Sequence, residues 1–411
     1  MLTLFTQKRE RLAFPARLAG VTAVMCCLFA GNGIVLPYLS RWLEAERHLH
    51  GAQIGAVLSL AQLTRLAVGP MIAFWADGAA DRRGPIRILS IAAALAFAGF
   101  FFLAHDFQSL LVWGFAALTL SQGLSPFVEG AVLRASEEGR ISYGLARGMG
   151  SAAFIVANVV GGATIARFGP GAVMVWVLTS YVLLVTTSWT GLKAEPAPVD
   201  AHGIPWRERF KGAIALLRMR RFVILIVACG LIQSAHAFYY GFATLVWRGQ
   251  GIDAGTAGLL WGFGVTAEVA FLWSLPLIER RLQPETLIVM GGAGAMVRWL
   301  LMGFAPTGFV LWPIQALHAL SFASSHVGAM RLIYRETPQA AAGLAQTLYA
   351  ALSAGLFMGL STLLSGVLYD AIGAHGYWIM AGIALIGAAV ASRLLNQGPI
   401  GAALLSGEHR P

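Results

Sequence analysis

Five strongly charged side chains lie inside long apolar stretches of this 411-residue sequence, and they are the residues best placed to do chemistry. Only Glu129 and Glu268 among the 19 acidic residues fall in such stretches, together with Arg65, Arg147 and Arg298. Placing an ionised group at bilayer depth costs about 2.5–3.5 kcal/mol, so such residues mark ion or substrate pathways. Three cations and two anions leave one positive charge, which an anionic ligand would neutralise.

The second half of the chain carries a candidate proton site. Glu268 lies far from both ends of its apolar stretch, so it is a candidate proton carrier. Arg298 is its natural partner, and His318 is a candidate relay because an imidazole titrates near neutral pH. The alternative is a permanent structural ion pair between Glu268 and Arg298, with His318 as a hydrogen-bonded link between helices.

The first half carries a candidate substrate site. Glu129 and Arg147 stand on either side of one short loop, and Phe154 shares a helix face with Arg147 because they are seven residues apart. We expect a polar contact and an aromatic platform for a substrate; the alternative is a structural ion pair near two helix ends. Arg65 is a further candidate substrate contact, and within the chain it is expected to pair with Glu268 or to cap the loop below it.

Aromatic rings form a second group of candidate substrate contacts. His236, Tyr239 and Tyr240 are spaced to lie on one helix face, and Trp299 supplies another large ring. An aromatic substrate could stack here while the tyrosine hydroxyls hold its polar end. Packing within the bundle is the more common use of such a stripe.

Opposite charges also gather in the short loop 75–87. In a tight, glycine-containing turn they could latch helix ends by charge and helix-dipole contacts. An ordinary basic loop is the alternative. The second half has a shorter counterpart at 279–281. The candidate latch residues are Asp77, Asp81, Arg82, Arg83 and Gly84.

The composition predicts which elements hold these residues. The chain is 57% hydrophobic and only 12% charged, whereas a soluble protein has about 25% charged residues. A soluble enzyme is therefore excluded, and an all-α membrane protein with twelve transmembrane helices is predicted. The predicted spans are 17–39, 51–76, 86–104, 108–134, 144–168, 171–190, 221–248, 255–278, 285–305, 308–333, 342–370 and 376–395.

The longest polar interruption divides these spans six and six. We predict an N-terminal six-helix bundle, a cytoplasmic linker with a surface helix, a C-terminal six-helix bundle and a cytoplasmic tail. The halves share a faint repeat, because Arg65 and Glu268 each follow a glycine by ten positions. Two pseudo-symmetric halves predict an alternating-access transporter whose site lies between them. The boundaries are 1–192, 193–220, 221–395 and 396–411.

Charge distribution predicts the orientation and the partners. Of the 29 Lys and Arg residues, 22 fall on one side, which places both termini in the cytoplasm of a multi-pass inner-membrane protein. This bias explains the net charge of +10 without nucleic-acid binding. The three cysteines lack disulfide or metal-ligand spacing, and no ATP-binding P-loop occurs. We expect no cofactor, no metal and a monomer in the lipid bilayer.

These residues resemble the major facilitator superfamily. Segment 73–87 is similar to its loop motif G-x-x-x-D-R-x-G-R in degenerate form, with Ala73 and Pro85 departing from the pattern. A more specific similarity is to the phenylpropionate-permease branch, which is related to lactose-permease-like proton symporters. It spans nearly the whole chain and is strongest in the second half. The matching stretches are 143–154, 235–242, 264–269, 297–299, 315–318 and 329–331.

The resemblance implies a twelve-helix fold and proton-driven uptake of a small carboxylate such as 3-phenylpropionate. Glu129 and Arg147 match the family's substrate positions. The family's proton site is matched by Glu268, Arg298 and His318. Those relatives carry a Glu three residues after the His, where this chain has Ser321, and this departure shifts the proton role towards Glu268.

The residues favour one function over three alternatives. The favoured one is proton-coupled symport of a small aromatic or similar monocarboxylate, with the anionic substrate and protons as partners. The transport alternatives are a proton-coupled antiporter that exports drugs or metabolites and a sugar or nucleoside proton symporter. An intramembrane enzyme is disfavoured because neither H-E-x-x-H nor G-x-S-x-G occurs.

Overall fold

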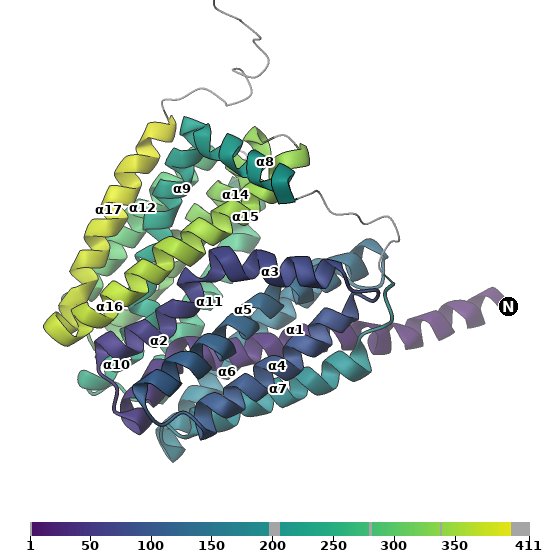
Figure 1. Ribbon diagram of the computed structural model, residues 1–411, viewed down its shortest axis with the longest axis horizontal. Coiled ribbons are helices and arrows are strands. Elements are labelled where there is room, and N and C mark those ends of the chain that lie inside the picture. The colour runs from purple at the N-terminus through teal and green to yellow at the C-terminus, as the bar shows by residue number, and fades with distance from the viewer. Residues whose placement is uncertain (1, 197–205, 279–281, 338, 396–411) are drawn as a thin grey trace, which may run out of the picture. The chain divides into compact units, whose positions relative to one another are not determined.

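The computed structural model describes residues 2–196, 206–278, 282–337 and 339–395, and every regular element within these ranges is a helix (Figure 1). This is the all-α architecture that the composition predicts, because a helix satisfies all its own backbone groups in lipid. The α-helices are α1 (Leu2–Arg47), α2 (Gly51–Leu63), α3 (Arg65–Asp77), α4 (Arg83–Phe102), α5 (Phe107–Glu137), α6 (Tyr143–Phe168), α7 (Ala172–Gly191), α8 (Trp206–Arg218), α9 (Arg220–Ser234), α10 (Ala237–Gly249), α11 (Ala254–Ile278), α12 (Pro284–Met302), α13 (Leu311–Ala316), α14 (Ser325–Glu336), α15 (Gln339–Tyr349), α16 (Met358–Ile372) and α17 (Gly376–Leu395).

These helices agree with the predicted twelve spans. Nine described stretches are long and apolar enough to cross a membrane, and ten are counted if the bent pair α2 and α3 is one span. The stretch Ala341–Leu395 is one of the nine, but it is interrupted at η4 (Gly373–His375) and so holds two spans. The helices α13 and α14 form one further, interrupted span. The twelve segments are therefore α1, α2–α3, α4, α5, α6, α7, α9–α10, α11, α12, α13–α14, α15–α16 and α17.

Packing divides the chain into two compact units. Unit 1 comprises Met1–Leu49, Ala67–Ala201 and Asp253–Gly262, and in it α1 packs on α6 and α7 while α4 packs on α5 and α7. Unit 2 comprises His50–Leu66, His202–Ile252 and Phe263–Pro411, and in it α12 packs on α17 and α14. Unit 2 thus includes α2, and α8 lies inside the predicted linker 193–220. The domain boundaries predicted by chain position stay a prediction.

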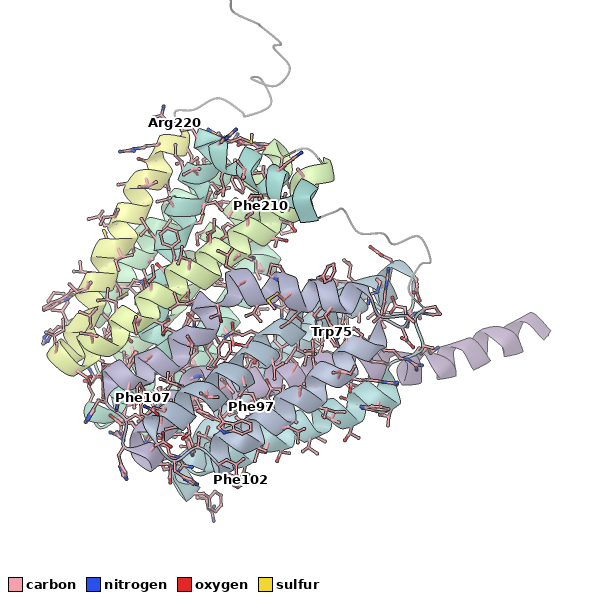
Figure 2. The ribbon with its side chains drawn as sticks, viewed as in Figure 1. Trp75, Phe97, Phe102, Phe107, Phe210 and Arg220 are labelled. Carbon is pink, nitrogen blue, oxygen red and sulfur yellow. The ribbon has the colours of Figure 1, made fainter. Side chains whose placement is uncertain are left out.

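In unit 1, the face that a side chain occupies on α4 decides its burial. Phe97 is buried and its ring lies 4.7 Å from that of Tyr181 on α7. Phe102 is exposed and points away from the helices (Figure 2). An exposed aromatic ring on a spanning helix suits contact with lipid.

The predicted single span 51–76 is broken. Its two halves, α2 and α3, meet at a bend of 46°. Thr64 stands at the break, and its Oγ1 donates a hydrogen bond to the Leu60 carbonyl at 2.9 Å. A threonine bonded back to residue i−4 bends helices, and Pro70 further weakens α3. As a result, Arg65 is the first residue of α3, directly after the bend.

A similar irregularity interrupts the segment that carries His318. Residues Ala319–Ser324 form the π-helical stretch η2 between α13 and α14. A second π-helical stretch, η3 (Ala350–Phe357), separates α15 from α16. Such π-helical turns frequently occur at functional sites. In unit 2, η2 begins directly after His318 and contains Ser321.

Within unit 2, α2 and α16 pack closely because glycines face each other. A Cβ atom added to Gly366 would lie 2.3 Å from the Gly51 carbonyl oxygen, so only glycine fits there. One turn further along α16, the Asp370 carboxylate accepts hydrogen bonds from the backbone N–H groups of Gly51 at 2.7 Å and Ala52 at 2.8 Å. The carboxylate satisfies two donors at the start of α2.

Candidate functional site

Arg298 is the centre of the polar cluster in unit 2. It is fully buried on α12, and its Nη2 donates to Gln315 Oε1 at 2.7 Å. Its Nη1 lies 2.9 Å from Nδ1 of His318. Among the described residues Arg298 has no ion pair with a carboxylate, and its Nε has no hydrogen-bond partner. A buried arginine without a direct counterion is costly, which makes this position a functional candidate.

Two aromatic rings make cation–π contacts with the guanidinium of Arg298. The Cζ atom lies 4.5 Å from the ring centroid of Tyr239 and 4.5 Å from that of Trp299. Tyr239 and Trp299 are both buried, and the His236 ring meets Trp299 edge to face at 5.0 Å. Two rings of the predicted aromatic stripe, Tyr239 and Trp299, therefore pack against the arginine, and His236 packs against Trp299. The proposed contacts of these rings and of Tyr240 with a substrate stay a prediction.

The contacts of His318 fix its tautomer. A guanidinium has only donors, so Nδ1 of His318 must accept the hydrogen bond from Arg298. The ring proton is then on Nε2, which lies 3.2 Å from Oε2 of Glu268 and donates to that carboxylate. A doubly protonated imidazole would put an N–H against the guanidinium. His318 is therefore neutral in this arrangement.

This chain of contacts corrects one expectation. Glu268 and Arg298 are not direct partners, because the His318 imidazole lies between them. The side chain of Glu268 is 21% exposed and that of His318 only 8%, so Glu268 is the more accessible end. If Glu268 gains a proton on one carboxyl oxygen, the other oxygen can still accept the hydrogen bond from His318 Nε2. The chain Glu268–His318–Arg298 then changes from neutral to positive without losing a hydrogen bond.

Ser321 joins His236 to the same cluster. Nδ1 of His236 lies 3.2 Å from the carbonyl oxygens of Ile232 and Gln233, so it carries the ring proton. Nε2 then accepts from the Ser321 hydroxyl at 3.1 Å. The Ser321 oxygen is also 3.4 Å from Arg298 Nη1 and can accept from it. Where the resembling symporters carry a carboxylate, this chain has a neutral hydroxyl.

In unit 1, the structure brings Glu129 on α5 together with Arg147 on α6. Arg147 Nε lies 3.9 Å from Glu129 Oε1, and the two side chains are 40% and 43% exposed. Arg147 also donates to Ser151 Oγ at 3.2 Å, and its Cζ lies 4.6 Å from the Phe29 ring. Phe154 lies two turns further along α6 and is half-buried. An exposed ion pair of this length contributes little to stability, so Arg147 is available to a ligand.

Arg65 makes neither of the two contacts that were expected within the chain, and its role as a substrate contact stays a prediction. It is half-buried at the start of α3, and the described residues give it no hydrogen bond and no ion pair. Its predicted pairing with Glu268 is wrong, because Glu268 contacts His318 instead. A Cβ atom added to Gly355 of η3 would lie 3.5 Å from the Cβ atom of Arg65, so the start of α3 packs against η3. The bend at Thr64 sets this position, and the sequence pattern did not indicate the bend.

The loop after α3 is tied to the segment after α7. Asp81 accepts hydrogen bonds from Arg83 Nε at 2.6 Å, from the Arg83 N–H at 3.0 Å and from the Glu195 N–H at 3.3 Å. Burial alone would raise the pKa of the Asp81 carboxyl, but these hydrogen bonds and the Arg83 charge lower it below its usual value. Gly84 donates its N–H to the Asp81 carbonyl at 2.9 Å, and Arg82 contacts Glu195.

The latch role of this loop stays a prediction. The side chain of Asp77 and the counterpart 279–281 lie outside what the structure describes. Glu195 was not among the expected residues, yet it contacts both Arg82 and Arg134. Its only signal in the sequence was a lone acidic residue among prolines and basic residues.

A second missed cluster lies at one end of unit 2. Arg221 Nε is 2.9 Å from both carboxylate oxygens of Glu336, and Arg221 also contacts Glu285. Arg221 Nη1 donates to the Leu394 carbonyl at 2.9 Å. This buried cluster joins the starts of α9 and α12 to the ends of α14 and α17, and Arg335 completes it. The sequence pattern indicated only loop charge for these basic residues.

In the described ranges, no group of three or more His, Cys, Asp or Glu could hold a metal ion.

Comparisons with known proteins concern the family and the fold of the chain. The family model described as "MFS_1 like family" matches residues 20–380. The chain is 28% identical over 358 residues to the "Probable 3-phenylpropionic acid transporter" of Escherichia coli (strain K12), covering 87% of this chain and 92% of that one. It is 25% identical over 348 residues to the "Maltose permease" of Geobacillus stearothermophilus, covering 84% and 85%.

Solved structures match in fold. The crystal structure of nucleoside transporter NupG has a TM-score of 0.80 at 15% identity, covering 93% of this chain and all of that one. The inward open xylose transporter XylE from E. coli has a TM-score of 0.67 at 12% identity, covering 93% and 98%. At these identities the likeness concerns the fold alone.

Proposed function

The chain belongs to the MFS_1 like family of transporters, and from this premise we propose that it takes up a small aromatic or similar monocarboxylate, such as 3-phenylpropionate, together with protons. The relative named for 3-phenylpropionic acid supports the substrate class. We place the chain in the inner membrane as a monomer. Both termini are placed in the cytoplasm because most Lys and Arg residues fall on that side.

One observation carries the proposal: among the described residues, the buried Arg298 is linked to Glu268 through a neutral imidazole and not by a direct ion pair. While Glu268 is ionised, its negative charge cancels the positive charge of Arg298, because His318 between them is neutral. When Glu268 is protonated, Arg298 is left without compensation in an apolar bundle, and an anion becomes the favoured ligand. Proton binding and anion binding then strengthen each other.

This linkage is reciprocal. If a proton on Glu268 raises the affinity for the carboxylate, the bound carboxylate raises the affinity of Glu268 for the proton by the same factor. Coupling between sites is typically worth about 1–3 kcal/mol. Loading both ligands from outside and releasing both inside, by the alternating access that the repeat predicts, would use the proton gradient to accumulate the substrate.

The two arginines have different parts in this scheme. Arg298 is fully buried, so it contributes its charge rather than a direct contact. Arg147 in unit 1 is partly exposed and only loosely paired with Glu129. A guanidinium donates two parallel hydrogen bonds to a carboxylate. We therefore assign the direct substrate contact to Arg147, with Phe154 as a ring that an aromatic substrate could meet on the same face of α6.

A sugar symporter is the second candidate, because a maltose permease is among the relatives. Counterflow in proteoliposomes that contain the purified chain distinguishes the two candidates. The vesicles are preloaded in turn with unlabelled 3-phenylpropionate, an aliphatic carboxylate, maltose or uridine, and uptake of the same compound in labelled form is measured. Counterflow of carboxylates alone supports the proposal. Counterflow of maltose or uridine, with none of carboxylates, contradicts it.

Proton coupling is tested in the same vesicles. An inward proton gradient should produce uphill accumulation of 3-phenylpropionate with co-movement of protons, and a protonophore should abolish it. Efflux that is stimulated by an inward proton gradient would instead indicate an antiporter that exports its substrate.

A further inference from the structure

A basic cavity lies in unit 1 where α4 begins and where α5 and α7 end. Its volume is about 330 Å³, at the lower end of the range of ligand pockets, about 300–1,000 Å³. Val21 of α1 and Ala131 and Ala135 of α5 form its apolar wall. The basic side chains that line it are Arg82, Arg83, Arg134, Arg140 and Lys193.

The cavity carries more positive than negative charge. Glu195 contacts both Arg82 and Arg134, Glu138 pairs with Arg140, and Asp81 pairs with Arg83. Five cations against these three carboxylates leave two positive charges. Lys193 is exposed, and the described residues give it neither a hydrogen bond nor an ion pair. The four arginine side chains are each partly exposed, so they retain donors for a ligand.

Neighbouring residues place the cavity at the level of lipid headgroups. Trp189 in the last turn of α7 is 54% exposed, and the Arg87 guanidinium lies 4.7 Å from its ring centroid. Arg87 also donates to the carbonyls of Ser188 and Trp189, at 3.1 and 2.9 Å. Exposed tryptophan and arginine together are typical of the membrane–water interface. Gly191, two residues beyond Trp189, lines the cavity.

We propose that this cavity binds the phosphate-bearing headgroup of an anionic phospholipid. Arginine donates to phosphate oxygens in a bidentate manner, and lysine adds a point charge. Basic pockets at the ends of membrane helices bind acidic headgroups in this way. On the predicted orientation the lipid belongs to the cytoplasmic leaflet. Its phosphate would bridge the loop at Arg82 and Arg83 to the segment at Lys193, and so stabilise the end of unit 1.

The proposal is tested on the purified full chain in a neutral detergent. Native mass spectrometry counts bound phosphatidylglycerol and phosphatidylcholine, and thermal unfolding is followed with each lipid and with inorganic phosphate. One tightly bound phosphatidylglycerol that raises the melting temperature, with no effect of phosphatidylcholine, supports a lipid headgroup. Equal effects of the two lipids overturn the proposal, and so does a stabilisation that inorganic phosphate alone reproduces in full.

A matched pair of variants locates the site. Lys193→Gln removes one cation without breaking an observed ion pair, and Arg167→Gln removes one cation at the other end of α6. Phosphatidylglycerol should bind about fivefold more weakly to Lys193→Gln, the effect of one basic residue near an anionic surface. Arg167→Gln should bind it like the parent chain. Equal weakening in both variants, or none in Lys193→Gln, overturns the assignment to this cavity.

Discussion

Arg298 donates a hydrogen bond from Nη1 to Nδ1 of His318 across 2.9 Å, and this contact allows only one protonation state of the imidazole. The ring proton must be on Nε2, where it faces Glu268 at 3.2 Å. A proton that enters this cluster can therefore be held by Glu268 but not by His318 as long as Arg298 stays in place. The proton-coupling proposal depends on this relationship.

Glu268→Gln should abolish uphill accumulation of 3-phenylpropionate and retain counterflow exchange, because the amide mimics the protonated carboxyl. Substrate affinity should also lose its dependence on pH. The measurement is transport into proteoliposomes with and without a proton gradient. Glu46→Gln, an exposed acidic position on α1, is the matched control and should transport normally. Normal accumulation by Glu268→Gln would remove Glu268 from the proton role.

His318→Leu should destabilise the chain by about 1.5–3 kcal/mol, because it removes hydrogen bonds from two ionised groups. His318→Gln should cost less, since an amide can accept from Arg298 and donate to Glu268. Thermal unfolding of both variants in detergent measures the difference. Equal loss in the two variants would mean that the shape of the imidazole, rather than its donor and acceptor, matters.

Arg147→Gln should raise the KM for the carboxylate at least tenfold while changing stability by less than about 1 kcal/mol, because its ion pair with Glu129 is exposed and long. Arg147→Lys should restore only part of the affinity, since an ammonium lacks the planar fork. Concentration-dependent uptake and thermal unfolding measure the two effects. Loss of stability with an unchanged KM would assign Arg147 a structural role.

Low pH should reduce the stability that Asp81 contributes through its contacts in the loop after α3. Because the folded-state pKa of this carboxyl is lowered, its contribution to stability is present above the unfolded pKa of about 3.9 and is lost as the pH falls through the folded value. Asp81→Asn should therefore be less stable than the parent chain at pH 6, and the difference should shrink below about pH 4. Thermal unfolding at pH 3–6 measures it. A difference that does not depend on pH would mean that the charge of Asp81 is irrelevant.

Asp370→Ala should destabilise unit 2 by about 0.5–2 kcal/mol, the usual cost of losing a cap at a helix start. The carboxylate satisfies two N–H groups at the start of α2, at Gly51 and Ala52. Asp370→Asn keeps one acceptor and should lose less. Thermal unfolding measures both variants, and hydrogen exchange at the start of α2 should rise in Asp370→Ala. Unchanged exchange would show that the cap does not hold this end of α2.

The sequence alone predicted much of the fold, because hydropathy along a spanning helix is a local property. An apolar run of about 20 residues needs no partner to be recognised as a membrane span. The breaks within spans were not predicted. The bend at Thr64 arises from one side-chain hydrogen bond, and the π-helical stretch after His318 has no local signature.

The identities of the candidate site residues were likewise evident from the sequence, since an ionisable residue inside an apolar run is rare and costly. Glu268, Arg298 and His318 were singled out in this way. Their connections were decided only by the tertiary structure. Helix rotation and packing place the imidazole between carboxylate and guanidinium, leave Arg65 without a partner among the described residues, and bring Glu195 to Arg82 and Arg134. Such contacts join residues far apart in the chain, and no local pattern contains them.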